Sequence, residues 1–334
     1  MLVPSDHLFF IFVNDSKVEV KKSNIVELEY PNNNASVLYS FFEELDRIKT
    51  NNLKVRILHY GDSQLEGDRI SSYIRRRLQE QFGGEGQGEI PIHSLSSIKN
   101  VSYKYSPNWS FYSIINLKRQ SFNHYGLMMS AARPYMKTIV DSLTNDTTYM
   151  KSAYVELSFA NKINKNLHLY YSNPIKHSTI KVYSNKGLIM DEDLEVNNSI
   201  LDMAIPISSP TSYLKIVTTG SPELYSIDQS ITSGVYLDNI SLRGSSGWGM
   251  SYNNPEFFSS MAARLNVNLI IMQFGVNVIP QDPTKIIKSY DFYEKEFSKQ
   301  LAFLKRNIPN AAIIVIGVSD RSVKVGESYK TNPN

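Results

Sequence analysis

Apolar and polar positions follow one spacing at the two ends of the chain and another in the middle. Near the start, apolar residues at helical spacing predict helices over Ser36–Thr50 and Ser71–Phe82. A short apolar run between them, Lys54–Tyr60, predicts a strand and leads directly into a polar turn at Gly61–Asp68. The glycine-rich segment Gly83–Gly88 follows a helix instead of opening one, so it predicts a helix stop and a loop, not a phosphate-binding loop.

From about Val101 to Ser233 the helical spacing fades, and short alternating runs replace it. Each run places its apolar side chains on one face and is bounded by Asn, Gly, Pro or Ser. Several such runs in succession predict antiparallel sheets packed as a β-sandwich. The clearest runs are Ala153–Phe159, Asn166–Tyr171, Thr179–Tyr183 and Tyr213–Val217.

After Gly234, strands and helices alternate again, which predicts a parallel sheet with helices on both faces. The sequence therefore indicates a doubly wound α/β sheet interrupted by an antiparallel β-sandwich. We expect the first part of the α/β domain at 1–100, the insert at 101–233 and the second part at 234–334. The predicted late elements are a strand at Val235–Leu242, a helix at Pro255–Leu265, a strand at Asn268–Phe274, a helix at Thr284–Asn307 and a strand at Ala311–Val318.

Composition excludes several classes of protein. The 334 residues carry 35 Lys and Arg against 32 Asp and Glu, and a net charge of +3 is too small for an electrostatic nucleic-acid binder. The absence of Cys excludes disulfides, thiolate zinc sites and cysteine nucleophiles. No apolar run is long enough to span a membrane. The short apolar run Leu8–Val13 has no basic leader and no small-residue cleavage site, so it does not resemble a signal peptide.

Polar or glycine-containing segments follow four of the predicted strands. They are Gly61-Asp62-Ser63, Gly244, Gly275-Val276-Asn277 and Ser319-Asp320. Because the carboxyl ends of parallel strands share one edge of a sheet, we expect these segments to converge there. A serine hydroxyl is a candidate nucleophile, and a glycine N–H and an asparagine amide are candidate donors to an oxyanion. This chemistry requires no metal and no cofactor.

In these blocks and their order, the sequence resembles the SGNH (GDSL-type) hydrolases. The resemblance implies a flavodoxin-like strand order, Ser63 as nucleophile, and an oxyanion hole made by the Ser63 and Gly244 N–H groups and the Asn277 amide. Gly247 is an alternative to Gly244. The stretch from Leu58 to Gly84 looks like the subgroup with an inserted, carbohydrate-binding-module-like β-sandwich, which includes peptidoglycan O-acetylesterases and related carbohydrate esterases. The resemblance thus implies an acetylated polysaccharide as substrate and a periplasmic or secreted location.

One part of the family pattern is absent. SGNH enzymes end with an Asp-x-x-His block that supplies the general base and the residue that orients it, whereas this sequence ends at Thr331–Asn334 without one. A serine without a base is a poor nucleophile. We therefore expect the chain to stop before that block, to depend on the block from outside, such as a second polypeptide, and to expose apolar sheet surface. The six histidines are His7, His59, His93, His124, His168 and His177.

Residues near the predicted site also have ordinary structural interpretations. We expect His59, His124, His168 and His177 to be structural or exposed, and Asp62 to shape the serine turn by accepting backbone N–H bonds. Asp320 is expected to cap a loop more than to line a pocket.

Two further features have competing interpretations. Trp109 belongs to an aromatic-rich stretch whose side chains either pack in the core or stack on sugar rings. The run Arg75–Arg77 is expected to form a solvated helix face. Two functions remain open: a serine esterase that deacetylates a polysaccharide, or a catalytically inactive protein that binds glycan.

Overall fold

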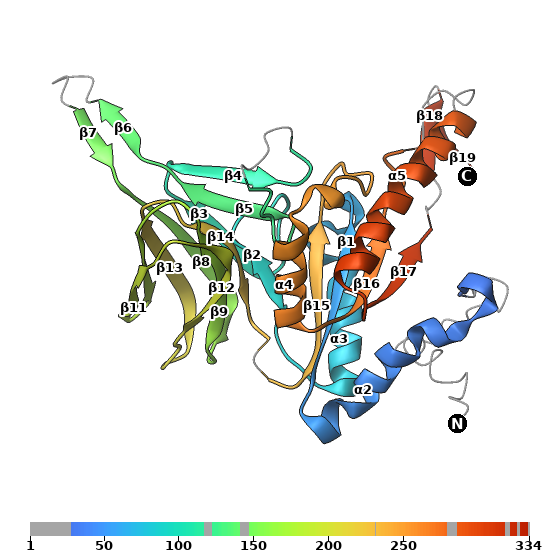
Figure 1. Cartoon of the computed structure of the whole chain (residues 1–334), viewed down its shortest axis with the longest axis horizontal. Helices are drawn as coiled ribbons and strands as arrows, with labels where there is room; N and C mark the ends of the chain where they lie inside the picture. The colour runs from blue at the N-terminus through green and yellow to red at the C-terminus, as the bar shows by residue number, and fades with distance from the viewer. Residues whose placement is uncertain are drawn as a thin grey trace.

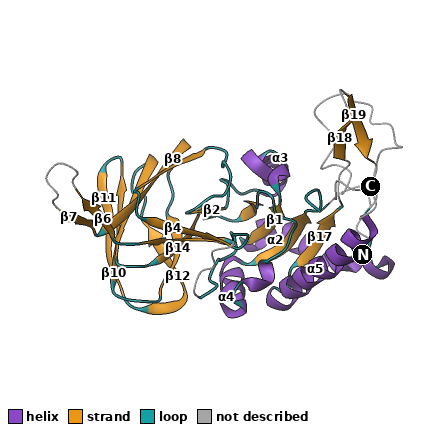
Figure 2. Ribbon diagram, turned by 90° about the horizontal axis from the view of Figure 1, so that it is seen from above, coloured by secondary structure: helices purple, strands orange, loops and turns teal. Residues whose placement is uncertain are grey.

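The computed structural model describes residues 28–116, 122–140, 147–230, 232–278, 286–317, 321–325 and 328–332. A parallel sheet with helices on both faces lies beside an antiparallel β-sandwich (Figures 1 and 2). This confirms the predicted α/β sheet interrupted by a β-sandwich. The apolar run at 8–13 lies outside the described residues.

The parallel sheet contains four strands in the order β15-β1-β16-β17. Counted along the chain within this sheet, the order is 2-1-3-4, which is the start of the flavodoxin-like order. The order reverses at β1, which pairs in parallel with β15 on one side and with β16 on the other. Ligands of such sheets bind outside the carboxyl ends of the strands at this reversal. The strands are β1 (Lys54–Gly61), β15 (Gly234–Ser241), β16 (Val267–Gln273) and β17 (Ala312–Ile316).

Two helices cover each face of the parallel sheet (Figure 1). On one face, buried side chains of α2 and α3 pack against alternate residues of β1 such as Val55 and Ile57. On the other face, α4 and α5 pack against residues such as Leu58. Gly83 ends α3 with a φ of +84°, as the predicted helix stop requires. The helices are α2 (Tyr39–Asn51), α3 (Ser71–Phe82), α4 (Pro255–Leu265) and α5 (Ile286–Asn307).

The β-sandwich consists of a sheet ordered β11-β10-β13-β8-β3 and a sheet ordered β12-β9-β14-β5-β4, with β2 paired to β14. Because β2 precedes residue 101, the antiparallel part of the molecule begins earlier in the chain than the alternation of apolar and polar residues predicts. The strands are β2 (Glu89–Pro91), β3 (Val101–Tyr105), β4 (Trp109–Ser113), β5 (Ser130–Pro134), β8 (Ser152–Ile163), β9 (Leu167–Asn173), β10 (Ser178–Ser184), β11 (Gly187–Leu194), β12 (Asn197–Ile205), β13 (Thr211–Thr219) and β14 (Glu223–Asp228).

Two antiparallel hairpins lie apart from these sheets. One projects from the end of the sandwich, and the other lies beyond α5 and β17 (Figure 1). They are formed by β6 (Lys137–Val140) with β7 (Thr147–Met150), and by β18 (Arg321–Val325) with β19 (Ser328–Asn332).

A buried charged cluster joins the sandwich to the parallel sheet. Arg56 of β1 donates to Asp238 of β15 at 2.8 Å and to Asp228 of β14 at 2.7 Å, and all three side chains are buried. The backbone N–H of Glu89, in β2, donates to Asp238 at 2.9 Å. Burial, followed by the charge of Asp238, raises the pKa of Glu89 to about 8, so this carboxyl is largely neutral at pH 7. The cluster therefore fixes how the insert sits on the sheet.

Strand β17 forms the outer edge of the described parallel sheet. Its last two side chains, Val315 and Ile316, are 50% and 37% exposed. This agrees with the expectation that the sheet leaves apolar surface uncovered.

Candidate active site

The turn after β1 carries Ser63 as the first residue of a short 3₁₀ helix, η4 (Ser63–Asp68). Asp62 caps this helix, because its carboxylate accepts the Gln64 N–H at 2.9 Å. Residue 61, just before Asp62, must be glycine. A Cβ at this position would lie 2.7 Å from the Leu65 side chain and 2.9 Å from the Gln273 carbonyl oxygen. The Ser63 side chain is half-buried, and its hydroxyl has no hydrogen bond to the residues that the structure describes. Asp62 thus has the turn-shaping role expected of it, and the Ser63 hydroxyl remains available.

A buried ion pair holds the far end of this turn. Arg75 of α3 makes two bonds to the Asp68 carboxylate, at 2.7 and 3.0 Å, and donates from Nε to the Leu237 carbonyl at 2.7 Å. The solvated role predicted for Arg75 is therefore wrong, although its neighbour Arg76 is exposed. The signal that could have identified it is spacing, because Arg75 lies three residues before the buried Leu78 and shares its helix face.

The Asn277 amide and the loop that carries Gly244 come together beside the serine turn. Asn277, four residues past the end of β16, donates from Nδ2 to the Ser245 carbonyl at 2.8 Å and lies 3.4 Å from an Asp62 carboxylate oxygen. Residues that follow β1, β15 and β16 therefore converge, as the parallel topology predicted. Gly244 is exposed with a φ of +76°, and its N–H has no hydrogen-bond partner in the described chain. No atom lies within 4 Å of where its Cβ would be.

Gly247, the alternative to Gly244, is a packing residue. Its N–H already donates to the Ser245 hydroxyl at 3.0 Å. A Cβ at this position would lie 2.9 Å from Phe297 and 3.0 Å from Phe274, at a φ of +83°. Gly244 is therefore the better placed donor of the two.

Two aromatic residues that sequence reasoning missed border the site. Tyr293 of α5 has its pKa raised to about 12, first by burial and then by the negative charge of Asp62. Trp248, three residues past Ser245, packs edge-on against Phe292 with ring centres 5.4 Å apart. The feature of the sequence that could have identified Trp248 is its place in a glycine-rich loop directly after a predicted strand. The rings of Trp248 and Tyr293 lie 6.4 Å apart, centre to centre, and Tyr293 is close enough to Asp62 to be affected by its charge.

The histidine nearest to Ser63 in the sequence, His59, has a structural role. Its ring is buried between the Ser71 hydroxyl at 2.9 Å and the Gln273 amide at 3.1 Å. Burial lowers its pKa to about 4, so the ring is neutral at pH 7. Both ring nitrogens are occupied, and His59 has no free nitrogen with which to accept a proton from Ser63.

The histidines of the insert also agree with the structural roles expected of them. His124 stacks on Phe257 with ring centres 4.0 Å apart, His168 lies 3.4 Å from Asp202, and the His177 side chain is 77% exposed. The sequence contains no histidine after His177. Ser319 and Asp320 lie outside the described residues.

Trp109 is a core residue of the sandwich. It is only 7% exposed, and its indole N–H donates to the Tyr154 carbonyl at 2.9 Å. One face of its ring is stacked over Phe111. A sugar cannot stack on a ring buried in this way, so the sugar contact expected for Trp109 is not supported by its position.

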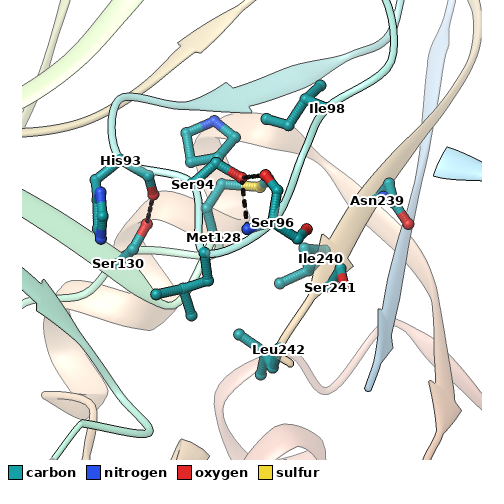
Figure 3. A pocket seen from close by; sticks show the side chains of 12 residues that line it. His93, Ser94, Ser96, Ile98, Met128, Ser130, Asn239, Ile240, Ser241 and Leu242 are labelled. Atoms are coloured by element: carbon teal, nitrogen blue, oxygen red, sulfur yellow. Dashed lines mark hydrogen bonds between the residues drawn. The ribbon is translucent and has the colours of Figure 1, made fainter. Parts of the chain in front are cut away.

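A small cavity lies beside the site, between the end of β15 and the loop after β2 (Figure 3). Its volume is about 20 Å³, which suits one water molecule and not a sugar. The loop is tied to the serine turn, because Gly67 N–H donates to the Ser97 carbonyl at 3.2 Å. Ser241, at the cavity wall, donates to the Asp62 carbonyl at 3.1 Å. The cavity therefore belongs to the support of the turn and is too small to hold a glycan.

Neither a cluster of metal ligands nor a helix suited to a bilayer occurs among the described residues. No group of three or more His, Asp or Glu side chains is placed to hold a metal ion. Among the described helices, none combines the length and the apolar character needed to cross a bilayer.

Comparison with known proteins shows similarity at the level of structure. No family model and no curated protein sequence matches the chain. A solved peptidoglycan O-acetylesterase aligns with a TM-score of 0.61 and 18% identity, over 86% of this chain and 73% of that one.

Two other alignments have TM-scores too low to establish a common fold. An acetyl xylan esterase from Butyrivibrio proteoclasticus aligns at 10% identity over 49% of this chain and 70% of its own, with a TM-score of 0.19. A family 29 carbohydrate-binding module aligns at 9% identity over 44% of this chain and 86% of its own, with a TM-score of 0.25. The chain thus shares with the peptidoglycan O-acetylesterase the fold expected from the sequence, a parallel α/β sheet interrupted by a β-sandwich.

Proposed function

We propose that the chain carries the nucleophile and the oxyanion hole of an SGNH-type serine esterase. The observation that carries the proposal is the hydrogen bond from Asn277 to the Ser245 carbonyl, within reach of Asp62. It brings the amide, the Gly244 loop and the Ser63 turn to one point, at the reversal of strand order where ligands bind such sheets. The parallel topology brings the three segments to one edge, and the residues that they carry there are a serine hydroxyl, a glycine N–H and a side-chain amide, the groups that this chemistry uses.

In this mechanism the Ser63 oxygen attacks the carbonyl carbon of an ester and gives up its proton. The carbonyl oxygen becomes an oxyanion, which accepts hydrogen bonds from the Gly244 N–H and the Asn277 amide. One Asn277 N–H is fixed by the Ser245 carbonyl at 2.8 Å, and the other makes only a long 3.4 Å contact with Asp62, so it is the one proposed to turn to the oxyanion. The base passes the Ser63 proton to the departing oxygen, which leaves as the alcohol while the acyl group stays bound to Ser63. Water then attacks the acyl group and releases the acid and free Ser63.

The proton of Ser63 needs a base, and His59, the histidine nearest to it in the sequence, is not free to act as one. His59 is neutral, buried and already bonded through both nitrogens. The base is therefore proposed to be a histidine from outside the sequence, for example from a second polypeptide. Removing the base or the nucleophile of such a unit abolishes most of the rate.

The proposed substrate is an O-acetylated polysaccharide such as peptidoglycan or another envelope or plant glycan. The neighbouring rings of Trp248 and Tyr293 would offer apolar contact for a sugar. A periplasmic or secreted location, where such glycans occur, is part of the same proposal.

The second candidate function is glycan binding without catalysis. The observation that favours it is that the Ser63 hydroxyl has no hydrogen bond to a base among the described residues, since a serine without a proton acceptor is an inefficient nucleophile. The two functions differ in how they depend on Ser63, because binding would not need its hydroxyl.

The test is acetate release from an O-acetylated polysaccharide by the complete natural protein and its Ser63→Ala variant. The esterase proposal predicts that the variant loses at least about a thousandfold in rate while its unfolding midpoint stays unchanged. Asn277→Ala is expected to lose about a hundredfold, as removal of one oxyanion donor does elsewhere. Equal rates for the natural protein and Ser63→Ala would overturn the proposal. Saturable glycan binding with no acetate release from the natural protein would support the second candidate.

A further inference from the structure

We propose that Glu66 and Arg243 are positioning residues for the oxyanion hole, because their ion pair holds the turn that carries the Gly244 N–H. This role rests on the proposed function, since it concerns the same site. Glu66 lies in the serine turn, and Arg243 directly precedes Gly244. The pair therefore links the segment that carries the nucleophile to the segment that carries the oxyanion donor.

The four residues Leu242–Ser245 form a β-turn. The Ser245 N–H donates to the Leu242 carbonyl at 2.9 Å, and Gly244, the third residue, has a φ of +76°. Arg243, the second residue, has no positive φ. A positive φ at the third position alone identifies a type II turn. Types I and II differ by a rotation of the central peptide through about 180°, so the turn type sets the direction of the Gly244 N–H.

Gly244 by itself does not fix that direction. Glycine adopts positive and negative φ about equally readily, so it fits the third position of either turn type. No atom lies within 4 Å of the place of a Cβ on Gly244, and its N–H bonds to none of the residues that the structure describes. The central peptide is therefore restrained from outside the turn, through the side chain of Arg243.

The ion pair has the geometry of a fork. Arg243 donates from Nε to one carboxylate oxygen of Glu66 and from Nη2 to the other, the second bond being 2.6 Å long. Two such bonds fix the direction of a guanidinium better than a single contact does. The hydrogen bond from Arg243 outweighs burial and lowers the pKa of the Glu66 carboxyl, so the pair is ionised at neutral pH.

The Glu66 end of the pair is held by the serine turn. Glu66 and Gly67 have φ values of −57° and +66°, as the two central residues of a type II turn do. The Glu66 carbonyl accepts the Arg69 Nε–H at 3.0 Å, and the Gly67 N–H donates to the Ser97 carbonyl at 3.2 Å. Because its backbone is fixed on both sides, Glu66 is a firm anchor for Arg243.

The first experiment measures the nuclear Overhauser effect between the Hα of residue 243 and the amide proton of Gly244, in the full chain labelled with ¹⁵N and ¹³C. A type II turn brings these protons together, because ψ of its second residue is about +120°, whereas a type I turn separates them. We expect a strong effect in the natural sequence and a weaker one in Glu66→Gln and Arg243→Gln. Arg264→Gln is the control, because it removes another partly exposed arginine pair, with Asp202, and should keep the effect strong.

The second experiment measures acetate release by the complete natural protein with the same substitutions. Glu66→Gln and Arg243→Gln should each lower kcat about twofold to fivefold, as loss of one exposed ion pair does, and Arg264→Gln should not. KM should stay unchanged, because the oxyanion forms only on the way to the transition state. The double variant should lose no more than either single variant, since each removes the whole pair. A merely structural role would lower the unfolding midpoint without lowering kcat per folded molecule.

The role of the pair is overturned if the Overhauser effect is as strong in Glu66→Gln as in the natural sequence. It is also overturned if kcat of both single variants is unchanged, or if their losses add in the double variant. Failure of the esterase proposal would look different, because the natural protein and Ser63→Ala would then release acetate at equal rates. The Overhauser effect would in that case still report whether the pair fixes the turn.

Discussion

Replacing Arg75 by Met tests whether a buried ion pair holds the serine turn. The guanidinium makes three hydrogen bonds, two to Asp68 and one to the Leu237 carbonyl, and both partners of the ion pair are nearly inaccessible to water. Met preserves much of the volume and the helical preference but none of the donors. The Asp68 carboxylate would then be left buried, with only the long 3.4 Å contact from Gln87.

The expected loss of stability in Arg75→Met comes from the Asp68 carboxylate, which stays buried without its partner. Removing one partner of a buried ion pair costs about 3 to 5 kcal/mol of unfolding free energy. The matched control is Arg76→Met, one residue along the same helix, whose pair with Glu80 is exposed on both sides. An exposed pair of this spacing contributes about 0.3 to 0.5 kcal/mol. The two variants should therefore differ by about 3 kcal/mol or more, although the sequence places both residues in one arginine run.

Urea denaturation followed by circular dichroism measures this difference. With a denaturant dependence of about 3 kcal/mol per M, Arg75→Met should lower the midpoint by about 1 M or more, and Arg76→Met by less than about 0.3 M. Asp68→Asn should resemble Arg75→Met, since asparagine keeps the left-handed conformation of residue 68 and loses only the charge. Equal midpoints for Arg75→Met and Arg76→Met would refute the reasoning that the pair is buried and holds the turn.

Three further predictions concern the pH dependence set by His59 and by Glu89, and the glycines of the loop after β15. Because the folded-state pKa of His59 is about 4 against 6.5 unfolded, stability should fall by up to about 3 kcal/mol as pH drops from 6.5 to 4, and His59→Gln should flatten that loss in denaturation curves. Glu89 changes stability with pH in the opposite direction. Because its folded-state pKa is about 8 against 4.5 unfolded, stability should fall as pH rises from 4.5 to 8, and Glu89→Gln should remove this pH dependence. Gly247→Ala should destabilise by several kcal/mol because its Cβ meets two phenylalanine rings, whereas Gly244→Ala, in open space, should cost about 1 kcal/mol; equal melting temperatures would contradict this.

Strong periodic segments made most of the fold predictable. The helices at Ser71–Phe82 and Pro255–Leu265 have the bounds that spacing and capping predicted, because their ends are set by local chemistry such as Asn254, which accepts the Phe257 N–H. Strands at the edge of the sandwich were harder to predict. Strand β2 has only three residues, and its pairing with β14 joins segments more than 130 residues apart, which no local pattern records.

The candidate site residues that lie directly after parallel strands could be predicted from the sequence. Ser63 and Asn277 could be placed together because parallel strands end at one edge. The positions of Arg75 and Trp109 could not be read from composition, since a charge in a run and an aromatic in a cluster look the same whether buried or exposed. Their locations depend on tertiary partners, the Asp68 carboxylate for one and the Tyr154 carbonyl for the other.

The central claim is that Ser63, Gly244 and Asn277 form one site for a tetrahedral oxyanion. The most direct measurement is the ¹⁵N NMR spectrum of the chain titrated with methylboronic acid, which adds to a serine oxygen and gives a tetrahedral centre without a leaving group. The account predicts saturable shifts of the Gly244 backbone amide and the Asn277 side-chain amide that disappear in Ser63→Ala. Unchanged resonances for both groups, or the same shifts in Ser63→Ala, would contradict it.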